Sequence, residues 1–424
     1  MDAILKKYSK VVSTNKTKGI NMCKQKNKAK AEKTEEIYEI SSKEYAILEE
    51  DERDQWSPVK AKYEKIPKVC FVTFGIAAIC GIIYIIALFN ADFADFINLY
   101  PGTAVRFILA KLSGILPFSL AEAVILLIPF ICFIGIWYLT KFRCDTRRSS
   151  IVSIVCILSV SAMLLSSFVL CLGIGYKGNP LEDKLGLVAE PVEVTELSDS
   201  TKHLIDKINE LTPQIMFGED GFSIMPYSFE EMNEKLLDAY DDFDDNHDFL
   251  ISFNSRLKPV LISEAMSYAH IAGVYTFFTG ESNINMNLPD YTIPYTAAHE
   301  LAHQRGVSRE DEANMIAFLV CIRSDDPYIQ YSAYLNMYEY VAAARQKADR
   351  DEYNLISRKL DLSVYNEMLA YSEFFKKYKK SVTSQVSGTV NDVFLKVQGT
   401  EGRASYGMVV DLTVAYFKSE NIID

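Results

Sequence analysis

The sequence predicts a membrane-anchored protein, in which three transmembrane helices precede a mostly helical α+β domain with a small β-hairpin ahead of a metal-binding helix. Three observations predict this fold class. Long apolar runs gather between residues 69 and 176, β-forming residues alternate with others between 259 and 287, and HELAH at 299–303 is followed by almost purely helical patterns.

Three apolar runs are long enough to span a bilayer. Residues 69–89 and 151–176 carry no charge, and residues 120–139 carry only Glu122, one turn from the start. A transmembrane helix needs about 20 such residues. The buried helix of a soluble protein can explain one run, but three close together favour membrane spans.

Lysine and arginine residues predict the orientation of these spans. Residues 1–68 hold sixteen of them, and four more lie in the loop after the second span, at 141–148. Positively charged segments stay in the cytoplasm. We therefore expect a disordered cytoplasmic tail at 1–67, a three-span anchor at 68–176 whose first span is the export signal, and an extracytoplasmic domain at 177–424.

The exported part contains helical patterns on both sides of one hairpin. A Pro/Glu linker at 188–197 precedes helices at 201–211 and 229–242, and the hairpin has strands at 274–278 and 282–286 with Thr279-Gly280 as the turn. After the HELAH helix, further helices are expected at 311–323, 327–348, 353–379, 382–397 and 406–417.

The HELAH pentapeptide predicts a catalytic metal site. In a helix, His299 and His303 project from one face and can bind one ion, while Glu300 faces the water on that ion. A zinc ion lowers the pKa of its water from about 15.7 to about 7, and Glu300 can take the proton as a general base. A chance match on a solvated helix is the alternative, but Gly306 provides a natural helix end. Zn²⁺ is therefore the expected cofactor.

A third ligand is needed, because catalytic zinc usually has three protein ligands and one open position. Glu310 and Glu312 are the nearest candidates. On a helix, Glu310 shares a face with small residues and with Asn314, whereas Glu312 shares a face with ordinary core residues and reads as an exposed acid at its end. We expect Glu310 to bind the metal and Asn314 to support a histidine ligand.

A group that stabilises the developing oxyanion is also expected. The candidates are His270, Tyr275, Tyr291 and Tyr406. The tyrosines at 331, 334 and 338 recur with helical spacing, so we expect them in the core rather than in the site.

The chain also resembles a known family. The resemblance rests on GVYTFFTGESNINMNLPDYTIPYTAAHELAHQRGVSREDEAN at 273–314, on SYGMVVDL at 405–412 and on the spans in front. These residues are similar to a bacterial membrane family catalogued as domain of unknown function 3810, over about residues 69–417. The resemblance implies a peptidase on the same HExxH pattern, and it favours Tyr406, within the SYG run, as the oxyanion stabiliser.

A more distant similarity is to the gluzincin metallopeptidases, which are zincins. In them the glutamate of an ExxxD motif binds zinc and the aspartate supports a histidine. Glu310 and Asn314 have this spacing, but asparagine replaces the aspartate, and only six residues separate His303 from Glu310. That separation is shorter than in most gluzincins.

Together these observations predict a membrane-anchored zinc peptidase that hydrolyses a peptide or protein substrate in the cell envelope or outside the cell. The alternative is a non-catalytic, zinc-stabilised module that binds an envelope component. Intramembrane proteolysis is disfavoured, because HELAH has polar neighbours and lies outside every span. The lipid bilayer is an expected partner, and a net charge of −12 argues against nucleic acid.

Overall fold

The computed structural model describes residues 65–141, 147–188, 190–379, 381–400 and 408–423. Within them, Lys68–Arg143 and Ile157–Asp424 form one compact unit, which carries the features discussed below except the first part of α8, at 147–156. The expected cytoplasmic tail lies almost entirely outside the described residues.

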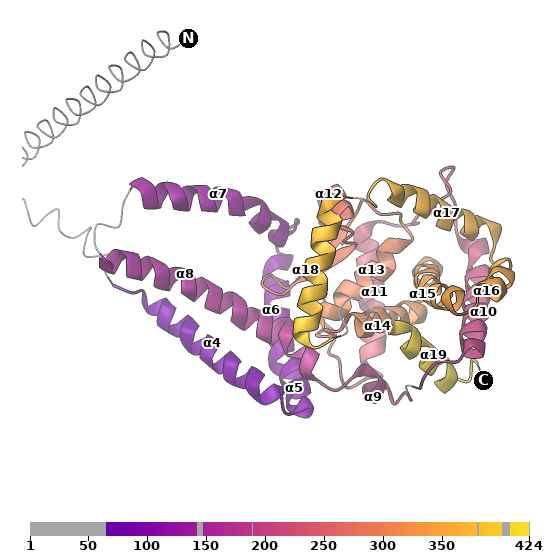
Figure 1. The fold of residues 1–424 in the computed structure, drawn as a ribbon, viewed down its shortest axis with the longest axis horizontal. Coiled ribbons are helices and arrows are strands. Elements are labelled where there is room, and N and C mark those ends of the chain that lie inside the picture. Colours follow the sequence, from indigo (N-terminus) through magenta and orange to yellow (C-terminus); the bar gives the residue numbers. More distant parts are fainter. Residues whose placement is uncertain (1–64, 142–146, 189, 380, 401–407, 424) are drawn as a thin grey trace, which may run out of the picture. The chain divides into compact units, whose positions relative to one another are not determined.

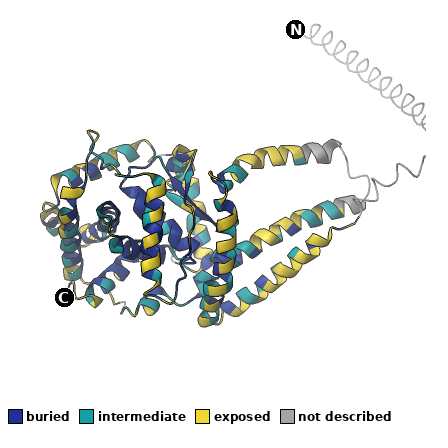
Figure 2. Cartoon of the chain, turned by 180° about the vertical axis from the view of Figure 1, so that it is seen from behind, coloured by how far each residue is buried: buried dark blue, intermediate teal, exposed yellow. Residues whose placement is uncertain are grey.

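Two helices are long and apolar enough to cross a membrane, α4 (Lys68–Ala87) and the stretch Ile151–Gly173. The second stretch comprises most of α8 (Arg147–Phe168) and the π-helix η2 (Val169–Gly173). Only 11% and 22% of their apolar windows are buried, whereas the core helix of a soluble protein is mostly buried. Figure 2 shows these helices largely in the colour of exposed residues, beside a domain with a buried centre.

Only two of the three expected spans are found among the described residues. The second expected span, at 120–139, corresponds to α7 (Leu120–Lys141), whose described apolar part, Leu120–Gly135, has fewer than 18 residues. Its first turn is also packed on the domain. The carboxylate of Glu122 is buried and accepts hydrogen bonds from the backbone N–H groups of Leu261 (3.1 Å) and Ile262 (2.8 Å).

Short helices connect α4 to α7. They are α5 (Ala91–Ile97), the π-helix η1 (Asn98–Gly102) and α6 (Thr103–Gly114). Asn90 begins α5, because its side chain accepts a hydrogen bond from the N–H of Phe93 (2.9 Å). In Figure 1 these helices lie where α4, α7 and α8 meet the helical domain.

The domain itself is mostly helical. Its helices before the metal site are α9 (Leu181–Leu185), α10 (Val194–Leu211), α11 (Phe229–Asp244) and α12 (Ser263–Ala269). Those from the site onward are α13 (Thr292–Gln304), α14 (Glu310–Arg323), α15 (Pro327–Ala348), α16 (Arg350–Ser357), α17 (Leu362–Lys376), α18 (Val382–Gln398) and α19 (Val409–Ser419).

Two expectations about helix boundaries are corrected. Helix α10 begins inside the expected linker, because Glu193 and Glu196 form a capping box at its start. The single helix expected at 353–379 is two helices, since Asp361 accepts a hydrogen bond from the N–H of Ser363 and begins α17 as a new helix.

A three-stranded sheet precedes the metal helix, in the order β1-β3-β2. The hairpin of β2 (Gly273–Thr276) and β3 (Glu281–Asn285) confirms the expectation with shorter strands, and Val274 pairs with Asn283. Strand β1 (Lys258–Val260) was not expected; it pairs with β3 in parallel. Every residue of β3 is buried, so the central strand contributes to the core.

The core is centred on α13, α14 and α15. Ala297, Ala298, Ala313 and Ala317 have no exposed surface. Small side chains allow helix axes to approach closely, so α13 and α14 can bring their side chains to one point.

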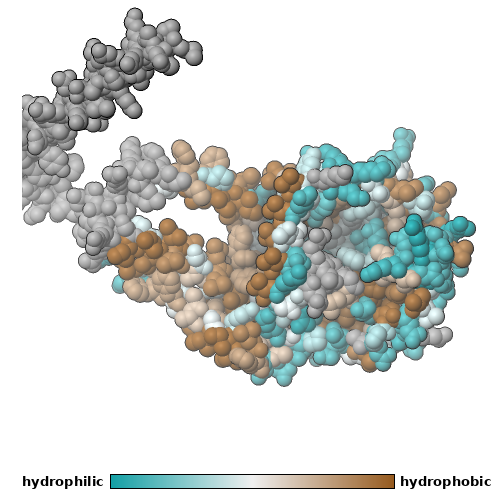
Figure 3. Space-filling view, viewed as in Figure 1, coloured by the Kyte–Doolittle hydropathy of each residue, from teal (hydrophilic) through white to brown (hydrophobic). Residues whose placement is uncertain are grey.

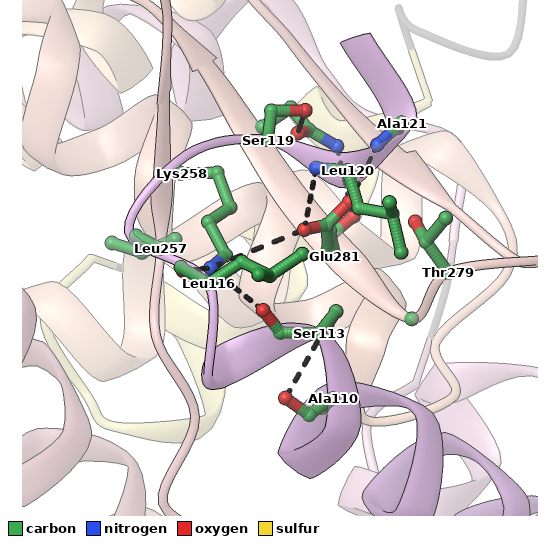
Figure 4. A network of polar contacts seen from close by, with 12 residues as sticks. Ala110, Ser113, Leu116, Ser119, Leu120, Ala121, Leu257, Lys258, Thr279 and Glu281 are labelled. Carbon is green, nitrogen blue, oxygen red and sulfur yellow. Dashed lines mark hydrogen bonds and ion pairs between the residues drawn. The ribbon is translucent and has the colours of Figure 1, made fainter. Parts of the chain in front are cut away.

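A buried polar network joins the sheet to the α6–α7 connection (Figure 4). The Lys258 ammonium donates to the carbonyl of Ser113 (3.0 Å) and lies 4.0 Å from the carboxylate of Glu281. That carboxylate accepts the backbone N–H groups of Leu120 (3.0 Å) and Ala121 (2.8 Å) at the start of α7. Because both charges are buried, removing one partner is expected to cost about 3–5 kcal/mol.

Candidate metal centre

Three side chains from two consecutive helices converge on one point. The Nε2 atoms of His299 and His303, one turn apart on α13, are 3.0 Å from each other. An oxygen of Glu310, the first residue of α14, lies 3.3 Å from the Nε2 of His299 and 3.6 Å from that of His303. These residues can hold a metal ion.

The spacing of the three atoms fits a tetrahedral ion. Two ligand atoms at 2.0–2.1 Å from a zinc ion in tetrahedral geometry are about 3.3 Å apart. The observed separations of 3.0, 3.3 and 3.6 Å surround that value. Two imidazoles with one carboxylate also suit a borderline transition metal better than calcium or magnesium, which prefer oxygen ligands.

A tight turn after α13 brings Glu310 back to the histidines. Gly306 has a φ of +103°, a conformation that strains residues with a Cβ. The N–H of Val307 donates to the carbonyl of Ala302 (3.0 Å), which closes the helix end. The carbonyl of Val307 in turn accepts a hydrogen bond from the Nδ1 of His303 (2.7 Å). This bond places the proton of the neutral ring on Nδ1 and leaves the Nε2 lone pair for a metal.

Residues 305–309, here called the ligand loop, are held by the segments next to the spans. Asn98 donates its side-chain amide to the carbonyl of Gly306 (2.8 Å), and Arg106 donates to the carbonyl of Arg305 (3.3 Å). The hydroxyl of Ser308 donates to the carbonyl of Leu172 at the end of η2 (2.6 Å). The loop between the last two candidate ligands is therefore fixed by residues next to the two candidate membrane helices.

The site has a strong electrostatic pairing. Burial alone would raise the pKa of Glu310, but hydrogen bonds with His299 and His303 and their positive charge hold it well below its usual range. Burial would lower the pKa of His303, but the Glu310 carboxylate outweighs it and raises the pKa to about 9. A cation that binds here therefore has to displace a proton from His303.

Glu300 lies beside the ligands and is almost completely buried. The Oε1 of Glu300 would be 2.6 Å from a Cβ at position 273, so only glycine at Gly273 leaves room for it. The hydroxyl of Ser282 donates to the backbone carbonyl of Glu300 (2.8 Å) and fixes this turn of α13 on β3. Burial raises the pKa of the Glu300 carboxyl, although the positive charges of the two histidines oppose it.

Two polar atoms at the site are buried without a hydrogen-bond partner among the described residues, Nδ1 of His299 and Oε2 of Glu300. Buried polar atoms normally have partners. The donor set and these two orphaned atoms fit a bound metal ion with a polar molecule beside it.

Glu312 and Asn314 are placed differently from expectation. Glu312 is buried, not exposed: it pairs with Arg309 (2.8 Å) and accepts the N–H of Leu181 (3.0 Å), away from the histidines. Asn314 has no hydrogen bond with His299 or His303 in the described part of the chain, and its side-chain nitrogen is buried there without a hydrogen-bond partner.

The candidates for an oxyanion stabiliser have separate surroundings. The ring of His270 contacts the carbonyl of Tyr378 (3.0 Å), and the hydroxyl of Tyr291 donates to Glu339 (3.3 Å). Tyr275 is fully buried, and its hydroxyl interacts electrostatically with Cys171 and Arg106. Tyr406 lies outside the described residues.

Sequence analysis missed two neighbouring residues on α15, Tyr340, which interacts with the charge of Glu310, and Glu339 beside it. Burial raises the pKa of Tyr340 to about 12, and the charges of Glu339 and Glu310 act in the same direction. Burial also raises the pKa of Glu339, to about 7. The sequence held one indication of Tyr340. Its spacing does not match that of the tyrosines at 331, 334 and 338, so it lies on another face of α15.

A comparison with protein families found one family whose model covers the candidate site. The family model described as Protein of unknown function (DUF3810) matches residues 98–414, which include η1, the sheet, α13 and α14. Neither a comparison with curated proteins nor one with solved structures found a match. Because the matched residues make up well over half of the chain, the protein belongs to the DUF3810 family.

Proposed function

We propose that this protein is a membrane-anchored, zinc-dependent peptidase of the zincin type, similar to gluzincins in its ligand set. One observation carries the proposal: two histidine nitrogens and a glutamate oxygen lie 3.0–3.6 Å apart, and a second, buried glutamate stands beside them. This is the two-histidine, one-carboxylate donor set of hydrolytic zinc sites.

His299, His303 and Glu310 would hold the zinc ion. Such an ion lowers the pKa of a bound water and polarises a substrate carbonyl. Glu300 is the proposed general base, and its raised pKa makes the carboxylate a better proton acceptor near neutral pH. The proton that Glu300 accepts can then pass to the leaving amine, since the same carboxyl group becomes an acid once protonated.

Strand β2 supports a peptide as the substrate. It is an edge strand, since the order of the sheet is β1-β3-β2, and its first residue, Gly273, touches the side chain of Glu300. An extended peptide can add to such an edge through main-chain hydrogen bonds. A peptide bound there would have its backbone next to the proposed base.

Anchoring in the membrane is part of the proposal. Apolar, exposed α4 and α8 support it. The lysine and arginine residues at 1–68 and 141–148 favour the cytoplasm for both segments, and the metal centre then lies outside if α7 also crosses the bilayer as a third span. A periplasmic or extracellular reporter fused after residue 180 should be active, and activity of a cytoplasmic reporter at that point would reverse the orientation.

The deciding experiment uses the full chain in phospholipid nanodiscs. Zinc content is measured by elemental mass spectrometry, and cleavage is measured on a library of quenched fluorescent peptides. We expect Glu300→Gln to keep zinc and lose at least about 10² in turnover, His303→Ala to lose zinc, and the exposed-site control Glu234→Gln to match wild type.

Each outcome has a separate meaning. Cleavage that survives in Glu300→Gln would remove the general-base role from this residue. Zinc bound at one ion per chain without any cleavage by the wild type would instead favour the non-catalytic module that binds an envelope component. Absence of stoichiometric metal in the wild type would contradict the zinc centre itself.

A further inference from the structure

Helix α18 carries a stripe of exposed valines. Val382, Val386, Val390, Val393 and Val397 are 56–76% exposed. Their spacing of four, four, three and four residues places them on one face of the helix. An exposed apolar stripe of this length in a folded domain indicates a surface that another apolar phase covers.

The neighbouring face of α18 is packed against the end of the second candidate span. The ring of Phe394 lies 6.1 Å from that of Phe168 at the end of α8 and 6.2 Å from that of Tyr176 just beyond η2. Lys177 also donates to the carbonyl of Gln398 (2.6 Å). The C-terminal end of the valine stripe therefore lies beside the point at which the chain would leave the bilayer.

Helix α6, in the connection between α4 and α7, carries a similar exposed apolar stripe. Ile108, Leu112 and the following Ile115 are spaced by four and three residues and are 55–77% exposed. In Figure 1, α6 and α18 run across the ends of the helices that point away from the domain. Figure 3 shows hydrophobic residues continuing from those helices to this border, and mainly hydrophilic residues over the rest of the domain.

The composition of α18 fits an interface between lipid and water. Valine is a mediocre helix former, so five exposed valines are not explained by helix propensity. The side of α18 next to the stripe carries Gln385, Thr389 and Lys396, which are exposed and polar. A helix with one apolar stripe and one polar side, lying at the end of a span, is typical of a segment in the plane of the membrane.

We propose that α18 lies on the bilayer, with its valine stripe in the boundary between headgroups and acyl chains. This inference rests on the proposed membrane anchoring, because only a bilayer crossed by α4 and α8 would meet this face. The occupant is phospholipid. A second copy of the chain on the same face is the competing outcome of the test.

The test places the photoreactive residue p-benzoylphenylalanine at single positions of the full chain in phospholipid nanodiscs. Val386 and Val390 report on the stripe, Gln385 on the polar side of the same helix, and Ile82, an exposed residue of α4, on the span. After illumination, lipid adducts are quantified by mass spectrometry of the intact protein.

Positions 82, 386 and 390 are expected to give at least about fivefold more lipid adduct than position 385. If position 82 gives adducts and both valine positions stay at the level of 385, the inference about α18 is overturned while the anchoring stands. If position 82 also fails, the anchoring proposal itself is wrong. Cross-linked dimers from 386 or 390 in place of lipid adducts would assign the stripe to a second copy.

Discussion

Glu310 and Glu312 are two residues apart in the same first turn of α14, and their carboxylates serve different purposes. Glu310 meets the two histidines, whereas Glu312 is paired with Arg309 and bonded to the N–H of Leu181. Residues two apart on a helix point in nearly opposite directions, so one turn can supply both a ligand and a structural ion pair.

The first prediction separates these two glutamates. Glu310→Gln should weaken zinc binding more than about 100-fold, because it removes a charged ligand, whereas the loss of an outer partner costs 10–100-fold. Glu312→Gln should keep zinc affinity but lower the free energy of unfolding by about 3 kcal/mol, because Arg309 loses its partner. Competition with a chromogenic chelator and chemical denaturation measure the two effects. The opposite pattern would move the ligand to Glu312.

Tyr340 provides the second prediction. Its hydroxyl interacts with the charge of Glu310 and with Asn314, so it can donate to an oxyanion near the ligands. Tyr340→Phe should lower turnover by about 10² without changing zinc content, and Tyr334→Phe on the same helix should have little effect. If Tyr406→Phe shows the loss and Tyr340→Phe does not, the stabiliser is Tyr406.

The third prediction concerns pH. Burial raises the pKa of Glu339 to about 7 in the folded chain, above the ordinary value of 4.5. The folded state therefore binds more protons than the unfolded state between these values, and stability falls as pH rises through that window. Glu339→Gln should remove up to about 3 kcal/mol of this fall between pH 5 and 8. Thermal unfolding of both proteins against pH measures it, and parallel curves would exclude the effect.

Sequence analysis predicted the convergence of the candidate ligands but not the groups around them. His299, Glu300 and His303 are local to one helix, and helical periodicity distinguished Glu310 from Glu312. Tyr340 and Glu339 come from α15, and only the packing of α15 on α13 brings them near. Glu312 read as exposed because its partners, Arg309 and Leu181, are defined by tertiary contacts.

At the scale of elements, the pattern of residues predicted the hairpin and most helices but not the breaks and long-range pairs. Strand β1 has three residues, and it is a strand only because β3 pairs with it in parallel. Sequence periodicity continued through residues 358–361, where Asp361 starts a new helix. The Glu122 carboxylate, read as one charge in a span, is bonded to backbone groups after β1.

The ligand loop provides the fourth prediction. Alanine at Gly306 would need a φ of +103° and would place its Cβ 2.5 Å from a nitrogen of Arg106. Gly306→Ala should therefore destabilise the protein by more than the 1–2 kcal/mol that the conformation alone costs, and it should weaken zinc binding. Gly186→Ala is the control, because Gly186 has a φ of +65° with nothing within 4 Å. Equal effects at the two glycines would show that the contact with Arg106 is unimportant.

At the scale of the whole molecule, the segments around the candidate membrane helices and the domain with the candidate metal centre share buried polar contacts. Arg106 has no exposed surface and bonds both Asn98 and the ligand loop, and Lys258 and Glu281 join the sheet to the α6–α7 connection. The sequence divided the chain at residue 177 because hydropathy changes there. Hydropathy does not register the bonds to the ligand loop and to the sheet, which link residues more than a hundred positions apart.

The fifth prediction follows from this sharing. A fragment of residues 177–424 lacks Asn98, Arg106 and the connection at 113–121, so it should neither fold cooperatively nor bind zinc. The matched control is Arg106→Lys in the full chain, which keeps the charge but loses the forked geometry and should retain a fold with weaker zinc affinity. Circular dichroism and zinc titration compare them. A fragment that binds zinc as tightly as the full chain would show that the anchor is only a tether.

The hydrogen bonds between the ligand loop and residues 98, 106 and 172 also set an order of assembly. These three residues leave the ribosome well before His299 and Glu310 do, so the platform for the loop is made before the candidate ligands exist. Under the proposed anchoring, this platform forms where the chain meets the bilayer. The proposed metal capture would then depend on insertion, and a precursor left in the cytoplasm would not compete there for zinc.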